Sequence, residues 1–170
     1  MFNIGRIIAT ASRPETIEWV KKFGATDVLN HREPLGPQLE ALGVQLSHAF
    51  ICHDTATNVE QLVPHMRPFG HIGSIVGGGA PVPINGDPAF FRSLSFSWEL
   101  MGSKTIFGYR IETQGQILEK LGKLVEEGTL PTIVTKREVF SLATLREGLE
   151  LQESGKVYGK LVFSVPDKWE

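Results

Sequence analysis

The most constraining stretch lies near the start of the chain, where a short apolar run leads into a polar pair and a proline. Arg6–Ala11 has the composition of a buried strand, Ser12-Arg13 stands at its carboxyl end, and Pro14 suits the first turn of a helix. Apolar residues then recur at three-residue spacing as far as Phe23, which is typical of one helix face. A strand that passes through a polar turn into a helix indicates a parallel α/β sheet.

The rest of the chain continues this alternation. Further strands are expected at Thr26–Leu29, Leu46–Cys52, Gly70–Val76 and Leu94–Trp98. Helices are expected at Pro34–Leu42, from a Thr57 or Asn58 cap through Val63, and at Thr113–Glu127. Ala80–Phe91 carries three prolines and is expected to be an irregular loop. Past Gly128 we expect an extended segment Pro131–Phe140, a helix Leu142–Glu153 capped by Ser141, and a last strand Val157–Val165.

The composition is that of an ordinary globular protein. The 170 residues are 41% apolar with a formal net charge of −2, so there is no electrostatic case for nucleic acid or an anionic membrane. No apolar run approaches the roughly 20 residues that span a bilayer, and no signal peptide is evident. The single cysteine, Cys52, fits a reducing compartment, so we expect a cytoplasmic location.

Ser12-Arg13 is the most informative polar pair. In an α/β sheet that binds a dinucleotide, the end of the second strand meets the adenosine ribose, and an acid there favours NAD. Arginine and serine instead attract a 2′-phosphate, so these residues favour NADP if a dinucleotide binds. The alternative is a solvated turn in which Ser12 caps the helix. The glycine-rich turn of such a sheet is expected about 20 residues earlier, and no residues of this chain occupy that place.

Other polar groups carry weaker signals. Gly77-Gly78-Gly79 is followed by prolines rather than a helix, which favours a flexible strand-end loop over a phosphate loop. The five histidines and Cys52 lack the spacing of a zinc site, so no metal site is expected. His53-Asp54 is expected to line a substrate site, and Trp98 to offer a flat wall to a ligand.

Several segments resemble the medium-chain dehydrogenase/reductase superfamily, and the resemblance extends from about Arg6 to Val165. Within that superfamily the chain is most similar to the zinc-type alcohol dehydrogenase-like group, which is related to quinone oxidoreductases. The segments that carry the resemblance are Ile8–Glu15, Phe23–Glu33, Ser95–Met101, Leu145–Gly148, Glu153–Lys156 and Gly159–Val162.

This resemblance implies a fold, a cofactor and a set of contacts. The fold is a Rossmann-like parallel sheet over residues 1–128 without its first strand and glycine-rich turn, followed by a strand-helix-strand segment over 129–170 that packs on a catalytic domain absent from the sequence. The cofactor is NADP, no zinc is expected, and no catalytic residue is assigned. The cofactor contacts implied are Ser12 and Arg13 at the 2′-phosphate, His31 near the adenosine, His53, Thr55, Ile75 and Gly77 along the groove, and Ser97 and Trp98 near the nicotinamide.

The function expected is that of part of an NADP(H)-dependent reductase acting on a quinone, an enone or an aldehyde/alcohol pair, with little activity and weak cofactor binding in this chain alone. Without the central first strand, the edges of Arg6–Ala11 and Leu46–Cys52 are bare. We expect these two strands to pair directly, or the chain to exchange strands or form a homodimer. The alternatives are a non-catalytic domain that pairs with another chain, and a receiver-like or flavin-binding domain, which leaves the carboxyl-terminal segment unexplained.

Overall fold

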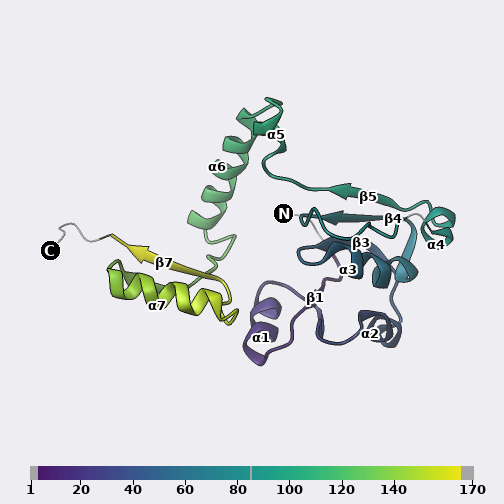
Figure 1. Ribbon diagram of the computed structural model, residues 1–170, viewed down its shortest axis with the longest axis horizontal. Helices are drawn as coiled ribbons and strands as arrows, with labels where there is room; N and C mark the ends of the chain where they lie inside the picture. The colour runs from purple at the N-terminus through teal and green to yellow at the C-terminus, as the bar shows by residue number, and fades with distance from the viewer. Residues whose placement is uncertain (1–3, 85, 166–170) are drawn as a thin grey trace. The chain divides into compact units, whose positions relative to one another are not determined.

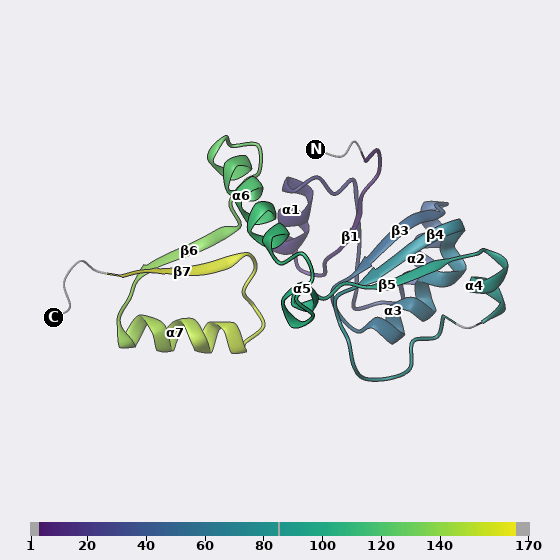
Figure 2. The ribbon, with the colours of Figure 1, turned by 90° about the horizontal axis from the view of Figure 1, so that it is seen from above.

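The computed structural model describes residues 4–84 and 86–165. The chain divides into two compact units, Met1–Ser103 and Lys104–Glu170, and each is described by itself (Figures 1 and 2). Among the described residues, no helix is both long enough and apolar enough to cross a membrane.

The first unit opens with two short parallel strands joined by a helix. Strand β1 (Ile8–Thr10) pairs with β2 (Asp27–Leu29), and helix α1 (Pro14–Lys22) connects them. The Ala11 amide extends the ladder by donating to the Leu29 carbonyl at 2.9 Å. This confirms the strand-turn-helix unit that the sequence predicts around the polar pair.

The same unit holds a second parallel sheet in the order β3-β4-β5. Its strands are β3 (Leu46–Ile51), β4 (Met66–Ser74) and β5 (Ser95–Trp98). Helix α3 (Thr55–Leu62) covers one side of this sheet, and helix α2 (Leu35–Leu42) packs against α3 and the 3-10 turn η1 (Val63–His65) (Figure 1). The main buried cluster lies between this sheet and α3, and it consists of Ile51, Val59, Val63, Met66, Ile72 and Ala89. A smaller one consists of Leu29, Leu35 and Leu39.

The two sheets correspond to the two sides of a Rossmann-like sheet. In the strand order 3-2-1-4-5-6, the first strand lies between the second and the fourth. Among the described residues no strand occupies that place, so β1 and β3 each have an unpaired edge. The direct pairing of these two strands that we expect from the sequence is therefore not formed. Strand exchange and self-association remain predictions.

Two local expectations are wrong, and one short helix has no counterpart among them. The expected loop contains helix α4 (Asp87–Phe91), and Pro88 sits in its first turn, where a missing amide hydrogen costs nothing. Asp54, rather than Thr57 or Asn58, caps α3. A short helix α5 (Ser103–Ile106) was not predicted.

The second unit contains helix α6 (Glu112–Glu126) and a strand-helix-strand segment. Parallel strands β6 (Val134–Val139) and β7 (Lys160–Ser164) are joined by α7 (Leu142–Glu153), as predicted. Ser141 caps α7, accepting from the Thr144 amide at 3.1 Å. A Cβ at Gly148 would lie 2.7 Å from the Leu161 and Phe163 side chains, so α7 approaches β7 closely there. The boundary after Ser103 separates two compact units. The boundary expected at 128 separates a nucleotide-binding domain from a segment that packs on another domain, and it remains a prediction.

Candidate functional site

A first group of polar side chains lies at the carboxyl ends of β1 and β2. Ser12 lies two residues past the end of β1 and His31 two residues past the end of β2, and the Ser12 Oγ lies 3.1 Å from the His31 Nε2. The parallel register places Thr10 beside Leu29, which brings the two turns to the same edge. His31 is exposed and Ser12 half-buried. The structure therefore joins two of the predicted contact residues into one hydrogen-bonded pair.

Arg13 begins the helix beside this pair. It occupies the N-cap position of α1, and its backbone amide and carbonyl both bond to the Thr16 hydroxyl, at 3.2 and 2.9 Å. Its guanidinium Nε lies 3.2 Å from Glu15 Oε1. The alternative in which Ser12 caps the helix is therefore wrong, because Ser12 bonds to His31 instead.

An acidic side chain stands at the opposite end of β2. Asp27 begins that strand and accepts two hydrogen bonds from Arg6, from Nε at 2.7 Å and Nη2 at 2.9 Å. These bonds and one from Thr26 lower the pKa of Asp27 to about 2. Asp27 therefore balances Arg6 at the amino-terminal end of the strand, away from Ser12 and His31.

A buried hydroxyl pair ties the carboxyl ends of β3 and β4 together. The Thr55 hydroxyl donates to the Val76 carbonyl at 2.6 Å and lies 2.7 Å from Ser74 Oγ, which accepts from the Val76 amide at 3.2 Å. Since Thr55 has one proton to give, Ser74 donates to Thr55 and the bonds close into a ring. Ser74 has no exposed surface and Thr55 is buried. The buried Thr55 side chain thus holds the start of the loop after β4 in place. A contact between Thr55 and a cofactor remains a prediction.

His53 and Asp54 occupy the turn between β3 and α3. Asp54 has φ 43°, a left-handed conformation that aspartate tolerates better than most residues. Its carboxylate accepts from the Thr57 amide at 3.3 Å, and hydrogen bonds from Thr57 lower the pKa of Asp54. Asn58 donates to the His53 carbonyl at 2.7 Å, which fixes the backbone and leaves the exposed ring of His53 toward solvent. The turn is a rigid platform with an exposed histidine.

The loop after β4 is the predicted strand-end loop. The Ile75 amide donates to the Ile51 carbonyl at 3.1 Å, so the loop begins beside the end of β3. Ile75 is 49% exposed and is therefore accessible. Gly78 and Gly79 have φ of 83° and 86°, which favours glycine. A Cβ at Gly77 would meet nothing within 4 Å, which leaves the backbone open to approach.

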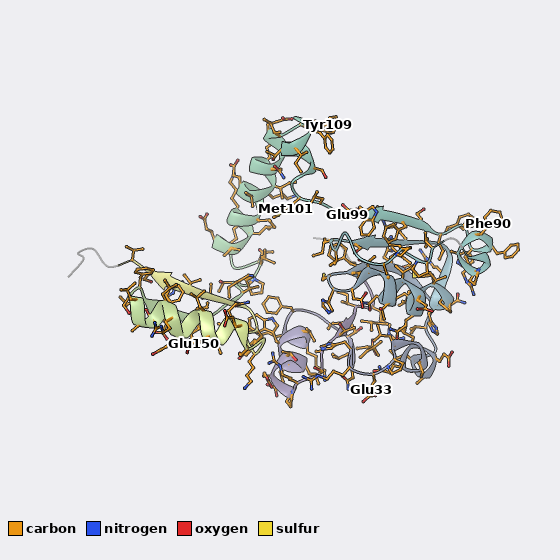
Figure 3. The ribbon with its side chains drawn as sticks, viewed as in Figure 1. Glu33, Phe90, Glu99, Met101, Tyr109 and Glu150 are labelled. Carbon is orange, nitrogen blue, oxygen red and sulfur yellow. The ribbon has the colours of Figure 1, made fainter. Side chains whose placement is uncertain are left out.

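The end of β5 carries a third group. Ser97 donates to Glu99 Oε1 at 2.8 Å and its Oγ lies 3.0 Å from His71 Nε2, so the Nε2 proton belongs to this bond (Figure 3 labels Glu99). The Glu99 amide donates to the Ser74 carbonyl at 2.8 Å, which fixes this end beside the β4 loop. Trp98 is 50% exposed and its ring stands edge-on to Phe96 at 4.9 Å between centroids.

The predicted contact residues thus lie in two groups at the strand ends. Ser12, Arg13 and His31 lie together at the ends of β1 and β2, while His53, Thr55, Ile75, Gly77, Ser97 and Trp98 lie along the ends of β3, β4 and β5. Sequence reasoning missed Glu15, His71, Ser74 and Glu99. The signal available for His71 and Ser97 was their place on one face of neighbouring strands.

Two other features do not mark a site of this kind. Within residues 4–84 and 86–165, no group of three or more histidine, cysteine or acidic side chains could hold a metal ion, so these residues do not fit a zinc centre. A hollow of about 620 Å³ is lined by Ile84, Ala89, Phe90, Ser93, Leu94 and Phe96. It lies at the amino-terminal end of β5, away from the polar strand ends.

Comparison with known proteins identifies the family. The family model described as zinc-binding dehydrogenase matches residues 23–163. The chain belongs to this zinc-binding dehydrogenase family. A zinc-type alcohol dehydrogenase-like protein of Staphylococcus aureus (strain COL) is 31% identical over 161 residues, which are 94% of this chain and 47% of the relative.

Two further likenesses bear on fold and cofactor. A crystal structure of a zinc-dependent alcohol dehydrogenase protein from Rhizobium etli CFN 42 matches with a TM-score of 0.78 at 33% identity, over 92% of this chain and 46% of that one. An NADP-dependent isopropanol dehydrogenase of Thermoanaerobacter brockii is 33% identical over 85 residues, 47% of this chain and 24% of the relative. The chain thus spans about half the length of the dehydrogenases that it matches over its whole length.

Proposed function

We propose that this chain forms the adenosine-phosphate end of an NADP(H) site in an oxidoreductase. The observation that carries the proposal is the set at the ends of β1 and β2, where Ser12, Arg13 and His31 offer hydroxyl, guanidinium and imidazole groups at one edge. Arginine and serine suit a 2′-phosphate, and arginine binds phosphate oxygens in a planar fork. The NADP dependence named for the isopropanol dehydrogenase supports the same choice.

The remaining predicted residues have a matching role in the proposal. His53, Ile75 and Gly77 border the groove along the β3 and β4 ends, and Ser97 and Trp98 lie toward the nicotinamide. When bound, the nicotinamide supplies the hydride, and the protein positions it against a quinone, an enone or an aldehyde/alcohol pair. The cytoplasmic location belongs to this proposal and rests on the single cysteine.

The test is a fluorescence titration of the chain with NADPH and with NADH. We expect both cofactors to bind weakly, because the described residues include no glycine-rich turn at a helix start that could hold the pyrophosphate. NADPH should bind at least about tenfold more tightly than NADH. Arg13→Gln should remove most of that preference, while Arg32→Gln, an exposed arginine past β2, should retain it. Equal affinity for the two cofactors would overturn the assignment of NADP.

A second function, pairing with another chain, is favoured by a separate observation. The edges of β1 and β3 are unpaired, and several aromatic side chains of the first unit are exposed, Phe69 at 81% and Phe50 at 64% among them. Bare strand edges and exposed aromatic surface promote association. Sedimentation should therefore show a homodimer or larger species at micromolar concentration. A folded monomer at all concentrations would exclude pairing between copies of this chain.

A further inference from the structure

The strongest unassigned feature is the ion pair between Arg13 and Glu15. Glu15 lies in the first turn of α1, and its Oε1 is 3.2 Å from the Arg13 Nε. The Arg13 side chain is 25% exposed and that of Glu15 46% exposed, so the pair lies at the surface beside Ser12. Within the described residues, Arg13 forms no other ion pair. The guanidinium assigned to the 2′-phosphate therefore already has an anion beside it.

We propose that Glu15 is a specificity-determining residue that limits the preference of this site for a 2′-phosphate. The inference rests on the proposed NADP site. In it, Glu15 is the counter-ion of Arg13 while the site is empty. A phosphate that takes a place beside Arg13 brings up to two negative charges near the Glu15 carboxylate. NADH lacks that phosphate, so its binding is not opposed in this way.

Two effects of Glu15 oppose each other, and their sizes decide the sign. By holding Nε at 3.2 Å, Glu15 restricts the Arg13 side chain, and a side chain that is already restricted loses less entropy when it binds a ligand. An exposed ion pair of this kind contributes little, because solvent screens it and side-chain entropy opposes it. Repulsion between a carboxylate and a phosphate dianion involves twice the charge of that pair and acts in the bound state. The repulsion prevails, so removing the Glu15 charge should tighten binding.

The position of Glu15 also has a structural role that the test must separate. An acid in the first turn of a helix interacts favourably with the helix dipole, so Glu15→Gln should lower the melting temperature slightly. That effect acts on α1 irrespective of the ligand. It does not change the ratio of affinities for two ligands that differ only in the position of a phosphate. The ratio is therefore the readout.

The experiment is an NMR titration of the full chain with adenosine 2′-monophosphate and adenosine 5′-monophosphate. For Glu15→Gln we expect binding of the 2′-phosphate to tighten about threefold to tenfold, and binding of the 5′-phosphate to change less than about twofold. Glu18→Gln is the matched control, because it removes the same charge from an exposed residue one turn along α1. It should leave both affinities within about twofold.

The outcomes separate the two proposals. If the unaltered chain shows no preference for the 2′-phosphate, the NADP site itself is wrong. If it shows the preference but Glu15→Gln leaves it unchanged or weakens it, the site stands and the role of Glu15 is overturned. In an Arg13→Gln background the gain from Glu15→Gln should shrink, because without the guanidinium the 2′-phosphate is no longer held beside the Glu15 carboxylate.

Discussion

The strand ends of the first unit differ between its two sheets. At β1 and β2 the polar side chains bond to one another but stay at the surface, as Ser12 with His31 and Arg13 with Glu15. At β3 and β4 the hydroxyls of Thr55 and Ser74 are buried and bond in a closed ring. In the proposed function, the first edge exchanges these partners for those of a ligand, while the buried ring at the second edge holds its loop in place.

The same contrast extends to the apolar residues. Ile72, in the central strand β4, has no exposed surface and belongs to the main cluster, whereas Ile8 in β1 is only half-buried. A two-stranded ribbon with three residues in each strand gains little from its own pairing. Stability should therefore reside in the β3-β4-β5 sheet.

The largest effect on stability is expected from replacing Ile72 in the central strand β4. Ile72→Ala should lower the free energy of unfolding by about 2–5 kcal/mol, because it leaves a cavity in the main cluster. Ile8→Ala makes the same chemical change in β1 and should cost about 1–2 kcal/mol, since less apolar surface is lost. Urea denaturation of both variants measures this. Equal losses would show that the two regions contribute alike.

The hydroxyl ring gives the next largest effect. Thr55→Val preserves shape but leaves the Val76 carbonyl without its donor and the Ser74 hydroxyl proton with only the longer bond to the Ile51 carbonyl, at 3.4 Å. We therefore expect a loss of about 1–3 kcal/mol. Thr10→Val, at an exposed position of β1, is the control and should change stability by less than about 0.5 kcal/mol. Thermal denaturation followed by circular dichroism compares the two variants. A Thr55→Val variant as stable as the control would show that the hydroxyl ring does not stabilise the fold.

The smallest effect concerns Arg6 and Asp27. The folded pKa of Asp27 is about 2, below the ordinary 3.8, so its contribution to stability is present above about pH 4 and is lost as the pH falls toward 2. Since the pair is exposed, we expect only a small change, confined to β1 and β2. Amide hydrogen exchange at Ile8–Thr10 between pH 5 and pH 2 should show it, and Asp27→Asn should abolish it. An unchanged pH dependence in Asp27→Asn would assign the effect to another group.

Sequence patterns predicted most of the secondary structure for identifiable reasons. Apolar periodicity, Pro14 and the Ser141 cap fix helices locally, so α1, α6 and α7 lie where we expected them. The three prolines of Ala80–Phe91 predict a loop, but Pro88 lies in the first turn of α4, where a helix accepts proline. The bare edges expected on the first and third strands are found on β1 and β3 among the described residues, but the direct pairing of these two strands is not formed, because no local pattern encodes pairing across the sheet.

The candidate site was predictable in position more than in detail. The family resemblance places Ser12 and His31 at the same end of the cofactor, and the structure joins them because residues that follow neighbouring parallel strands gather at one edge of the sheet. The partners of these residues could not be predicted in the same way. Glu15 turns back to Arg13 through side-chain geometry, and the ring of Thr55 and Ser74 depends on the β3–β4 register.

We propose that the exposed ends of β1 and β2 bind the 2′-phosphate of the ligand, while the structure at the ends of β3 and β4 stays unchanged. Amide hydrogen exchange of the chain, with and without saturating adenosine 2′-monophosphate, tests this most directly. With the ligand bound, we expect slower exchange over Ala11–Thr16 and His31–Glu33, with no change over Ile51–Thr55 or Ser74–Val76. Slower exchange confined to the β3 and β4 ends, with none at Ser12 and Arg13, would contradict it.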